Sequence, residues 1–320
     1  MMRLKLVPKN TSWNFFSRSK LWIGISIILV VLSLISFFVQ SLNFGIDFRG
    51  GTSIRTESSE PINVAAYRSA LSSLDLGDIT ISEVFDPSFE ADQNVAMIRI
   101  QAQPGQEAAT SILVENSLQK LKVVSENIKF VSVESVGPKV SGELIRTAII
   151  AVILAISAVL FYIWIRFEWQ FAVGAISALI HDVILTIGIF SLLQIKFDLA
   201  IIAAILTIVG YSLNDTVVVF DRVRENLRKF KKRSLIEVMN LSINETMSRT
   251  VMTSVTTLLA LISLFVLGGD VIRGFVFAMI WGVVVGTYSS IFIASAILLW
   301  TGVKRDWTKP NAEAGTQVPQ

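Results

Sequence analysis

Ionisable side chains occur inside long apolar runs in the second half of the chain, and their chemistry needs an explanation. Asp215 lies six residues before Asp221 in one run, and Arg249 directly precedes another. His181 and Asp182 lie near the middle of a third. Where such runs cross a bilayer, an ionisable group is costly and indicates a functional site. A carboxylate that loses its charge when desolvated and regains it beside a cation is suited to proton transfer.

The runs around Asp215 and after Arg249 also carry polar or small residues at helical spacing. One face holds Thr207, Gly210, Tyr211, Asn214 and Asp215, and the other holds Arg249, Thr253, Thr256, Thr257 and Ala260. We expect both faces to point into a helix bundle. The six residues of helix from Asp215 to Asp221, at the end of the apolar run, span roughly 9 Å. The loop charges described below predict that this end is cytoplasmic, so Asp215 is expected in the cytoplasmic half of the membrane. Two antiparallel helices could then bring Asp215 and Arg249 together as an ion or proton relay, supported by Asn214, Tyr211 and Thr253.

Packing offers a second interpretation of these groups. Asp215 and Arg249 would then be a static ion pair that only fixes helix packing, although such pairs are often no better than apolar substitutes. His181 and Asp182 would be either a relay or a hydrogen-bonded packing pair, and both readings stay open. Close helix approach is predicted at two faces rich in small residues. These are Gly282, Gly286, Ser289 and Ser290, and Gly174, Ala178, His181 and Gly188.

The composition agrees with a membrane setting. Of 320 residues, 52% are hydrophobic and only 17% are charged, with a mean hydropathy of +0.63. Charged residues make up about a quarter of an ordinary globular chain, so much of this surface does not face water. The lack of cysteine excludes disulfides and thiolate metal sites, and a single histidine excludes a histidine-rich metal cluster. We expect no cofactor, no metal and no enzymatic activity, with a proton as the coupling ion.

Six apolar runs are long enough to cross about 30 Å of hydrocarbon. They are Leu21–Val39, Thr147–Ile165, Phe171–Leu193, Leu199–Phe220, Val251–Leu267 and Gly274–Trp300. The first follows a basic segment and ends without a small-x-small cleavage signature, so it is predicted to be a retained anchor and not a signal peptide.

Lysine and arginine in the short connections predict the orientation, because positively charged loops stay cytoplasmic. Sixteen lie on one side of the predicted membrane, against Lys196 and Arg273 on the other. Both termini are therefore expected in the cytoplasm. The predicted order is an N-tail (1–20), a first helix (21–40), an extracytoplasmic domain (41–143), five helices (144–300) with a basic cytoplasmic loop (221–247), and a C-tail (301–320).

The basic run 222–233 could bind nucleic acid or lie against anionic lipid. It contains only one aromatic residue, Phe230, on which a base could stack, and it adjoins a membrane helix. We therefore expect it to lie near anionic lipid and to bind no nucleic acid. The polar tail after Trp307 is predicted to be disordered.

The extracytoplasmic insert alternates strand-like and helical patterns. The strand-like stretches are 52–56, 79–85, 94–101 and 128–136, and the helical ones are 61–74 and 107–121. The order βαββαβ predicts an α+β, ferredoxin-like domain between the first two membrane helices of an otherwise α-helical protein. Gly50-Gly51 could form a phosphate loop, but no Lys-Ser/Thr follows, so a tight turn into the first strand is the better interpretation.

Four motifs together resemble the SecD/SecF family of protein-export membrane proteins, within the resistance-nodulation-division superfamily. They are FGIDFRGGT at 44–52, GYSLNDTVVVFDRVREN at 210–226, SRT and TSVTT at 248–257, and GTYSS at 286–290. The resemblance extends from the first apolar run to the last. One departure is Glu245, where the family pattern has Gln.

The resemblance implies partners and a task. The partners are a SecD subunit with six further helices, the SecYEG channel, YajC and unfolded preprotein, all at the bacterial inner membrane. The implied task is to use the proton-motive force, or a sodium gradient, to promote late preprotein translocation, with Asp215 and Arg249 as the coupling pair. A small-solute exporter of the same superfamily and a structural scaffold for the channel are the alternatives.

Overall fold

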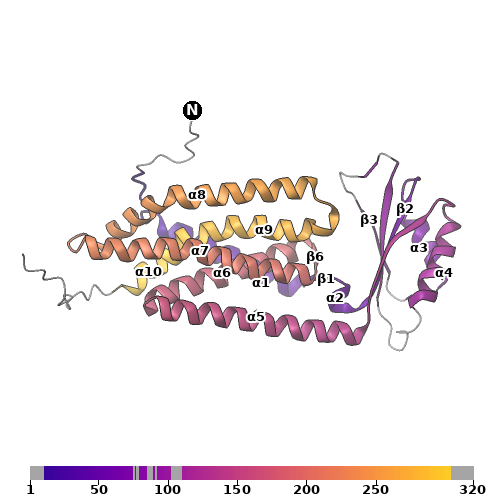
Figure 1. Ribbon diagram of the computed structural model, residues 1–320, viewed down its shortest axis with the longest axis horizontal. Helices are drawn as coiled ribbons and strands as arrows, with labels where there is room; N and C mark the ends of the chain where they lie inside the picture. Colours follow the sequence, from indigo (N-terminus) through magenta and orange to yellow (C-terminus); the bar gives the residue numbers. More distant parts are fainter. Residues whose placement is uncertain are drawn as a thin grey trace, which may run out of the picture.

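The computed structural model describes residues 11–74, 76, 79–84, 89–90, 92–101 and 110–303. Predictions for 1–10, for most of the C-tail and for the beginning of the helix expected at 107–121 lie outside these residues. Within them, six helices are long and apolar enough to cross a membrane. They form an elongated bundle with an α+β domain at one end (Figure 1).

The helices of membrane length match the predicted runs. They are α1 (Ser19–Gln40), α5 (Pro138–Arg166), α6 (Trp169–Leu193), α7 (Leu199–Lys229), α8 (Leu235–Leu267), and a continuous last span of α9 (Asp270–Ser289), the π-helical η1 (Ser290–Ala294) and α10 (Ser295–Thr301). The prediction of six membrane helices is confirmed. Helices α6, α7 and α9 to α10 bury the most surface, whereas α1, α5 and α8 leave most of theirs uncovered.

The segment 221–247, predicted as a basic cytoplasmic loop, is mostly helical. Helix α7 continues to Lys229, and α8 begins at Leu235 with a capping box in which Ser234 and Glu237 exchange hydrogen bonds. Hydropathy marks only where a helix enters the membrane, and charged residues can continue it into water. A short turn thus joins two helices that extend beyond their apolar runs.

The segment before α1 is bound to the start of α8. Asn244 accepts a hydrogen bond from the backbone N–H of Trp13 (3.0 Å) and donates one to its carbonyl (2.9 Å). One turn earlier, Asn240 accepts from the N–H of Phe15 (2.8 Å). We call residues 13–15 the N-terminal strap. It fastens the start of α1 to a helix far away in the sequence.

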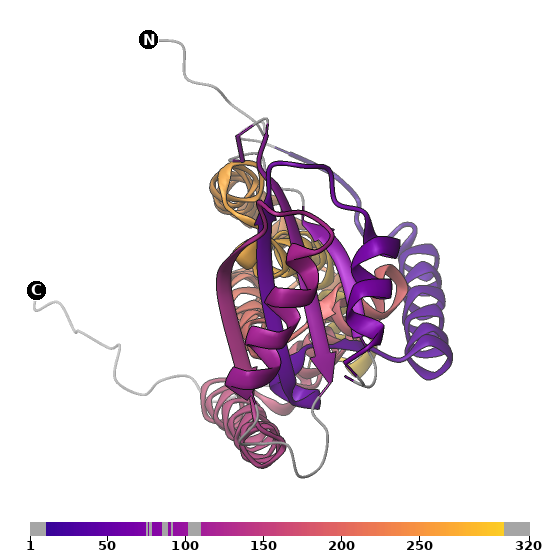
Figure 2. The ribbon, with the colours of Figure 1, turned by 90° about the vertical axis from the view of Figure 1, so that its right-hand side faces the viewer.

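The α+β domain has the predicted order βαββαβ in β2 (Gly51–Ser58), α3 (Val64–Ser72), β3 (Ile79–Val84), β4 (Asn94–Gln101), α4 (Thr110–Lys122) and β5 (Lys129–Val136). The antiparallel sheet has the order β3-β4-β2-β5. Helices α3 and α4 cover the face that points away from the membrane bundle (Figure 2). Ile54, Ile98 and Ile100 pack there against Tyr67 and Leu121.

Gly50 and Gly51 form the predicted turn. They follow the short helix α2 (Ile46–Arg49), and their φ angles of 70° and 132° lie in a region that favours glycine. Just before them, β1 (Asn43–Phe44) pairs in parallel with β6 (Lys196–Phe197) at the start of α7. The turn therefore leads directly from the membrane bundle into the first strand of the sheet.

The junction between domain and bundle is narrow. The carboxylate of Asp47 in α2 accepts the backbone N–H of Leu199 at the start of α7 (3.1 Å), and Ser141 of α5 donates to the Asp47 carbonyl (2.9 Å). Beside these contacts, a polar cavity of about 630 Å³ separates the uncovered sheet face from the helix ends nearest the domain. Arg55, Arg99 and Arg273 are among its lining residues.

Candidate ion-coupling site

Asp215 and Arg249 lie at the same depth on neighbouring helices. Counted from the helix ends nearest the α+β domain, at Leu199 and Leu267, they lie about 24 Å and 27 Å into the bundle at 1.5 Å per residue. Helices α7 and α8 pack against each other. The Asp215 side chain is buried, with a residue exposure of 3%, whereas Arg249 is exposed. The structure thus brings the predicted pair to one level of the membrane.

The two groups interact without a direct ion pair. No N–O distance of 4.0 Å or less joins them among the described residues, although the guanidinium is close enough to act electrostatically on the carboxylate. Asp215 Oδ2 is buried and has no hydrogen-bond partner in the described part of the chain. An unpaired buried polar atom costs about 1–3 kcal/mol, and it often marks a site of function. The direct contact that a static ion pair requires is not seen between these two side chains.

Two hydroxyl groups on the same helices share this condition. Tyr211 Oη on α7 and Thr250 Oγ1 on α8 are buried and have no hydrogen-bond partner among the described residues. Tyr211 precedes Asp215 by about one turn, and Thr250 directly follows Arg249. Unpaired polar atoms therefore gather on α7 and α8 around the coupling pair. Thr250 was not among the residues predicted for the site.

The polar faces predicted to point into a helix bundle are exposed in large part, although Asp215 is buried and Tyr211 and Thr257 are half-buried. Asn214 is exposed on α7 together with Thr207 and Gly210, and Thr253 is exposed on α8 together with Arg249, Thr256 and Ala260. We call this surface the polar stripe. A β-carbon added at Gly210 would meet no atom within 4 Å. Lipid is a poor neighbour for polar groups at membrane depth, so a stripe of this kind needs another protein to cover it.

Glu245 is bound by α7. Its Oε2 accepts hydrogen bonds from Arg222 Nε and Asn226 Nδ2, both at 2.7 Å. Arg222 also pairs with Glu225 on its own helix. The charge of Glu245 is thus matched beyond the end of the apolar run. It does not pair with Arg249, which lies one turn further along α8.

His181 and Asp182 lie in a second buried network on α6. Asp182 Oδ2 accepts hydrogen bonds from Ser212 of α7 (2.6 Å) and Ser289 of α9 (2.7 Å), while Oδ1 lies 3.0 Å from His181 Nδ1. Asp182 is fully buried, and His181 is 6% exposed. The two serines come from other helices, and nothing in their sequence spacing pointed to this carboxylate.

Glycines allow the central helices to approach closely. A β-carbon at Gly282 would collide with three atoms of the Ile208 side chain on α7. At Gly286 it would lie 3.0 Å from Ser212 Cβ, and at Gly188 it would collide with Ser33 of α1. These contacts set the distances from α9 to α7 and from α6 to α1.

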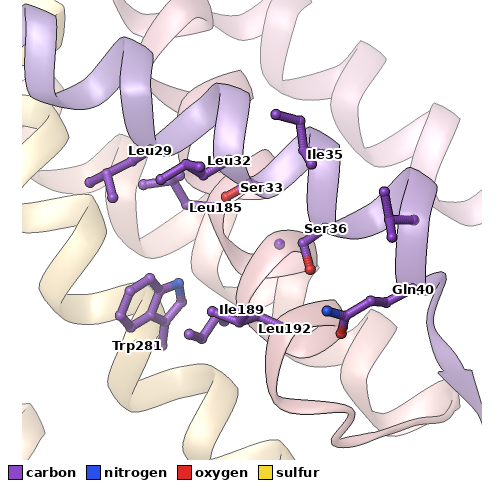
Figure 3. Close-up of a pocket in the computed structure, with 12 residues that line it drawn as sticks. Leu29, Leu32, Ser33, Ile35, Ser36, Gln40, Leu185, Ile189, Leu192 and Trp281 are labelled. Carbon is purple, nitrogen blue, oxygen red and sulfur yellow. The ribbon is translucent and has the colours of Figure 1, made fainter.

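A groove of about 370 Å³ lies between α1, α6 and α9 and is lined mainly by apolar side chains (Figure 3). Leu29, Leu32 and Ile35 line it from α1, and Trp281 lines it from α9. None of its lining residues in the described chain is ionisable.

Comparison with known proteins agrees with the motifs. A family model described as "Protein export membrane protein SecD/SecF, C-terminal" matches residues 116–304, and one described as "SecD/SecF GG Motif" matches residues 35–62. The protein translocase subunit SecF of Cereibacter sphaeroides is 59% identical over 98% of this chain and 97% of its own length. That of Rhodobacter capsulatus is 57% identical over 97% of this chain and 95% of its own length.

Solved structures show the same likeness. The translocon-associated membrane protein SecDF from Thermus thermophilus matches with a TM-score of 0.80 and 34% identity, and SecDF in a super-membrane-facing form matches with 0.68 and 35%. Each match covers 94% of this chain and 40% of the other, so the chain spans less than half of those SecDF proteins. Its six apolar helices and its bacterial relatives make it a multi-pass protein of the bacterial inner membrane. The chain belongs to the SecD/SecF family of protein-export membrane proteins.

Proposed function

We propose that the chain is the SecF subunit of the SecDF accessory complex of the Sec translocon. In this role it uses the proton-motive force to promote late preprotein translocation across the plasma membrane. Both termini lie in the cytoplasm, and the α+β domain is a ferredoxin-like domain outside it. The names of the relatives and the likeness to SecDF support the assignment, and the site supports the energy source.

The observation that carries the proposal is the unpaired, buried oxygen of Asp215 beside Arg249. A proton on Asp215 would neutralise a charge that the membrane interior disfavours, and the nearby guanidinium favours its release. One proton that crosses the full membrane potential releases about 2.3 kcal/mol per 100 mV. Repeated cycles of that size can bias a conformational equilibrium.

The polar stripe supports a SecD partner. It places Asn214, Thr253 and Arg249 on a surface that this chain leaves uncovered at membrane depth. A second set of helices with its own small and polar residues would cover it and complete the surroundings of Asp215. SecYEG, YajC and unfolded preprotein are proposed partners on the family resemblance alone, and anionic lipid is the proposed neighbour of the basic end of α7.

The junction offers a route from the site to the domain. Asp215 lies on α7, and the first residue of that helix is held by Asp47, three residues before the turn into β2. The sheet itself is separated from the helix ends by the polar cavity. A shift of α7 can therefore reach the domain through α2 without breaking a broad interface.

The test is export by the complex reconstituted with SecD and SecYEG in vesicles, measured with and without an imposed proton gradient. Asp215→Asn keeps the size and polarity of the side chain and removes its titration, so it should abolish the stimulation by the gradient. Asp221→Asn is the matched control, because Asp221 is on the same helix and pairs with Arg166 outside the apolar run. Full stimulation in Asp215→Asn would exclude this residue as the proton site.

A further inference from the structure

We propose that His181 and Asp182 form a second proton-binding site in the membrane, where His181 Nε2 takes up a proton and Asp182 balances the charge. The proposal deepens the function proposed above and rests on it. His181 lies 12 residues from each end of α6, about 18 Å from either end of the helix. It is therefore as deep in the bundle as a side chain on this helix can be.

As part of the proposal, we assign Asp182 as an ionised carboxylate, the form that can accept from every polar neighbour at once. Ser212 and Ser289 both donate to Oδ2, and His181 Nδ1 lies within hydrogen-bond distance of Oδ1. Only the ionised form can accept from all three, because a protonated carboxyl group must use one oxygen as a donor. Three helices thus hold one negative charge that is completely buried.

The tautomer of His181 follows from this arrangement. An ionised Asp182 only accepts, so the proton of a neutral imidazole is on Nδ1, and Nε2 carries a lone pair. Nε2 is buried and has no partner among the described residues. The one free position on the ring is therefore a proton acceptor. A histidine that served packing alone would be expected to satisfy both nitrogens at this burial.

Few other ionisable groups approach the pair. Of the helices packed against α6, α1 carries only Lys20 at its start, and α7 carries Tyr211 and Asp215 in its buried stretch. The half of α9 nearest η1 carries Tyr288. Helix α5 carries Tyr162 in its apolar stretch, and its charged residues, among them Glu143, Arg146 and Arg166, lie toward its ends. The Tyr288 ring lies 6.1 Å from the imidazole, and its hydroxyl bonds Ser26 and the Trp22 carbonyl on α1. The charge nearest to the imidazole is thus Asp182 itself.

Two features connect the pair to the proposed coupling site. Ser212 lies three residues before Asp215 on α7, so one helical turn carries both the donor to Asp182 and the coupling carboxylate. On the other side, Ser289 is the last residue of α9 before the π-helical η1. Single π turns within α-helices are frequent at functional sites. A change in charge at His181 would act on both helices through these serines.

The proton step is simple. A proton from a hydronium ion adds to the lone pair of Nε2 and leaves a water molecule, and the hydrogen bond from Nδ1–H to Asp182 stays in place. The product is an imidazolium beside a carboxylate, a pair with no net charge. On release the same nitrogen loses the proton, and the two serines continue to hold Asp182.

The single histidine makes this step observable, because labelling with ¹⁵N-histidine reports His181 alone. Solid-state NMR of the labelled full chain, assembled with unlabelled SecD in lipid vesicles, separates the two ring nitrogens. At about pH 9 we expect a protonated Nδ1 and a bare Nε2, with Nε2 becoming protonated as the pH falls to about 5. In Asp182→Asn the charge is not balanced, and the change should be lost. A wild-type Nε2 that stays bare over the whole range would overturn the proposal.

Measurements of export distinguish a proton-binding role of His181 from a role in packing alone. His181→Asn keeps a side-chain N–H near the position of Nδ1 and removes Nε2, so it should assemble with SecD and lose the stimulation by the gradient. Ser191→Ala is the control, because it removes another buried hydroxyl from the same helix. That hydroxyl accepts a hydrogen bond from Ser36 and donates one to the Ser41 carbonyl. Full stimulation in His181→Asn would assign the histidine to packing. The proposed function fails differently, if wild-type export ignores the gradient while Nε2 still titrates.

Discussion

Gly282→Ala tests whether α9 packs on α7 as closely as the structure shows. The added methyl group would collide with Cγ1, Cγ2 and Cδ1 of Ile208, whose residue exposure is 1%. Overpacking by a methylene costs about 1–3 kcal/mol. Alanine recovers about 1 kcal/mol through its higher helix propensity. The expected result is a net destabilisation of about 1 kcal/mol, measured by denaturant unfolding of the full chain in detergent.

A double-mutant cycle makes the test sharper. Ile208→Ala removes all three colliding atoms and should cost about 2–5 kcal/mol through the cavity it leaves. In the double variant the methyl group of residue 282 fills part of that cavity. The destabilisation of the double variant should therefore be smaller than the sum of the two single destabilisations by at least about 1 kcal/mol. Gly24→Ala on α1 is the control, because its β-carbon would meet no atom within 4 Å. Simple additivity of Gly282→Ala and Ile208→Ala would refute the packing argument.

Three further predictions concern other surfaces. Gly210→Leu adds a side chain where this chain has open space, so it should leave the fold of the isolated chain intact and reduce co-purification with SecD. The control Gly24→Leu should leave co-purification with SecD unchanged. Equal recovery of SecD with both variants would show that the polar stripe is not the interface. Asn244→Ala removes two hydrogen bonds to the N-terminal strap, which should lower the unfolding free energy by about 1–2 kcal/mol and speed amide exchange at Trp13; unchanged exchange would contradict it. Burial raises the pKa of the Tyr67 hydroxyl above 10.0, so the folded state is favoured below pH 10 and loses that advantage as the pH rises through the folded-state value. Tyr67→Phe should therefore show a smaller loss of stability above pH 10, and an identical alkaline profile would contradict this.

Hydropathy and alternation were sufficient for the architecture. Long apolar runs located all six membrane helices, and the change from helical to two-residue periodicity located the strands of the α+β domain. The ends of α7 and α8 far from the α+β domain were missed because a helix that leaves the membrane becomes charged without ending. Ser234 and Glu237, which form the capping box, were the available signal for the start of α8.

The candidate site could be predicted only in part. Asp215 was identifiable because a charge inside an apolar run is unusual, and Arg249 because it lies at the beginning of another such run. The sequence did not show which way their polar helical faces point, because the same pattern of polar residues is expected whether a face packs inside its own bundle or against a partner. The donors to Asp182 were hidden for another reason, because Ser212 and Ser289 are ordinary residues in membrane helices and gain meaning only through the fold.

The polar stripe also has a consequence for how the chain is maintained in a cell. A copy without its partner would present Arg249, Asn214 and Thr253 to lipid, which is the kind of surface that membrane quality control can distinguish from a finished complex. Unassembled copies should therefore be short-lived, and the amount of this protein should follow the supply of the subunit that covers the stripe. The same residues would then serve both energy coupling and the matching of subunit numbers.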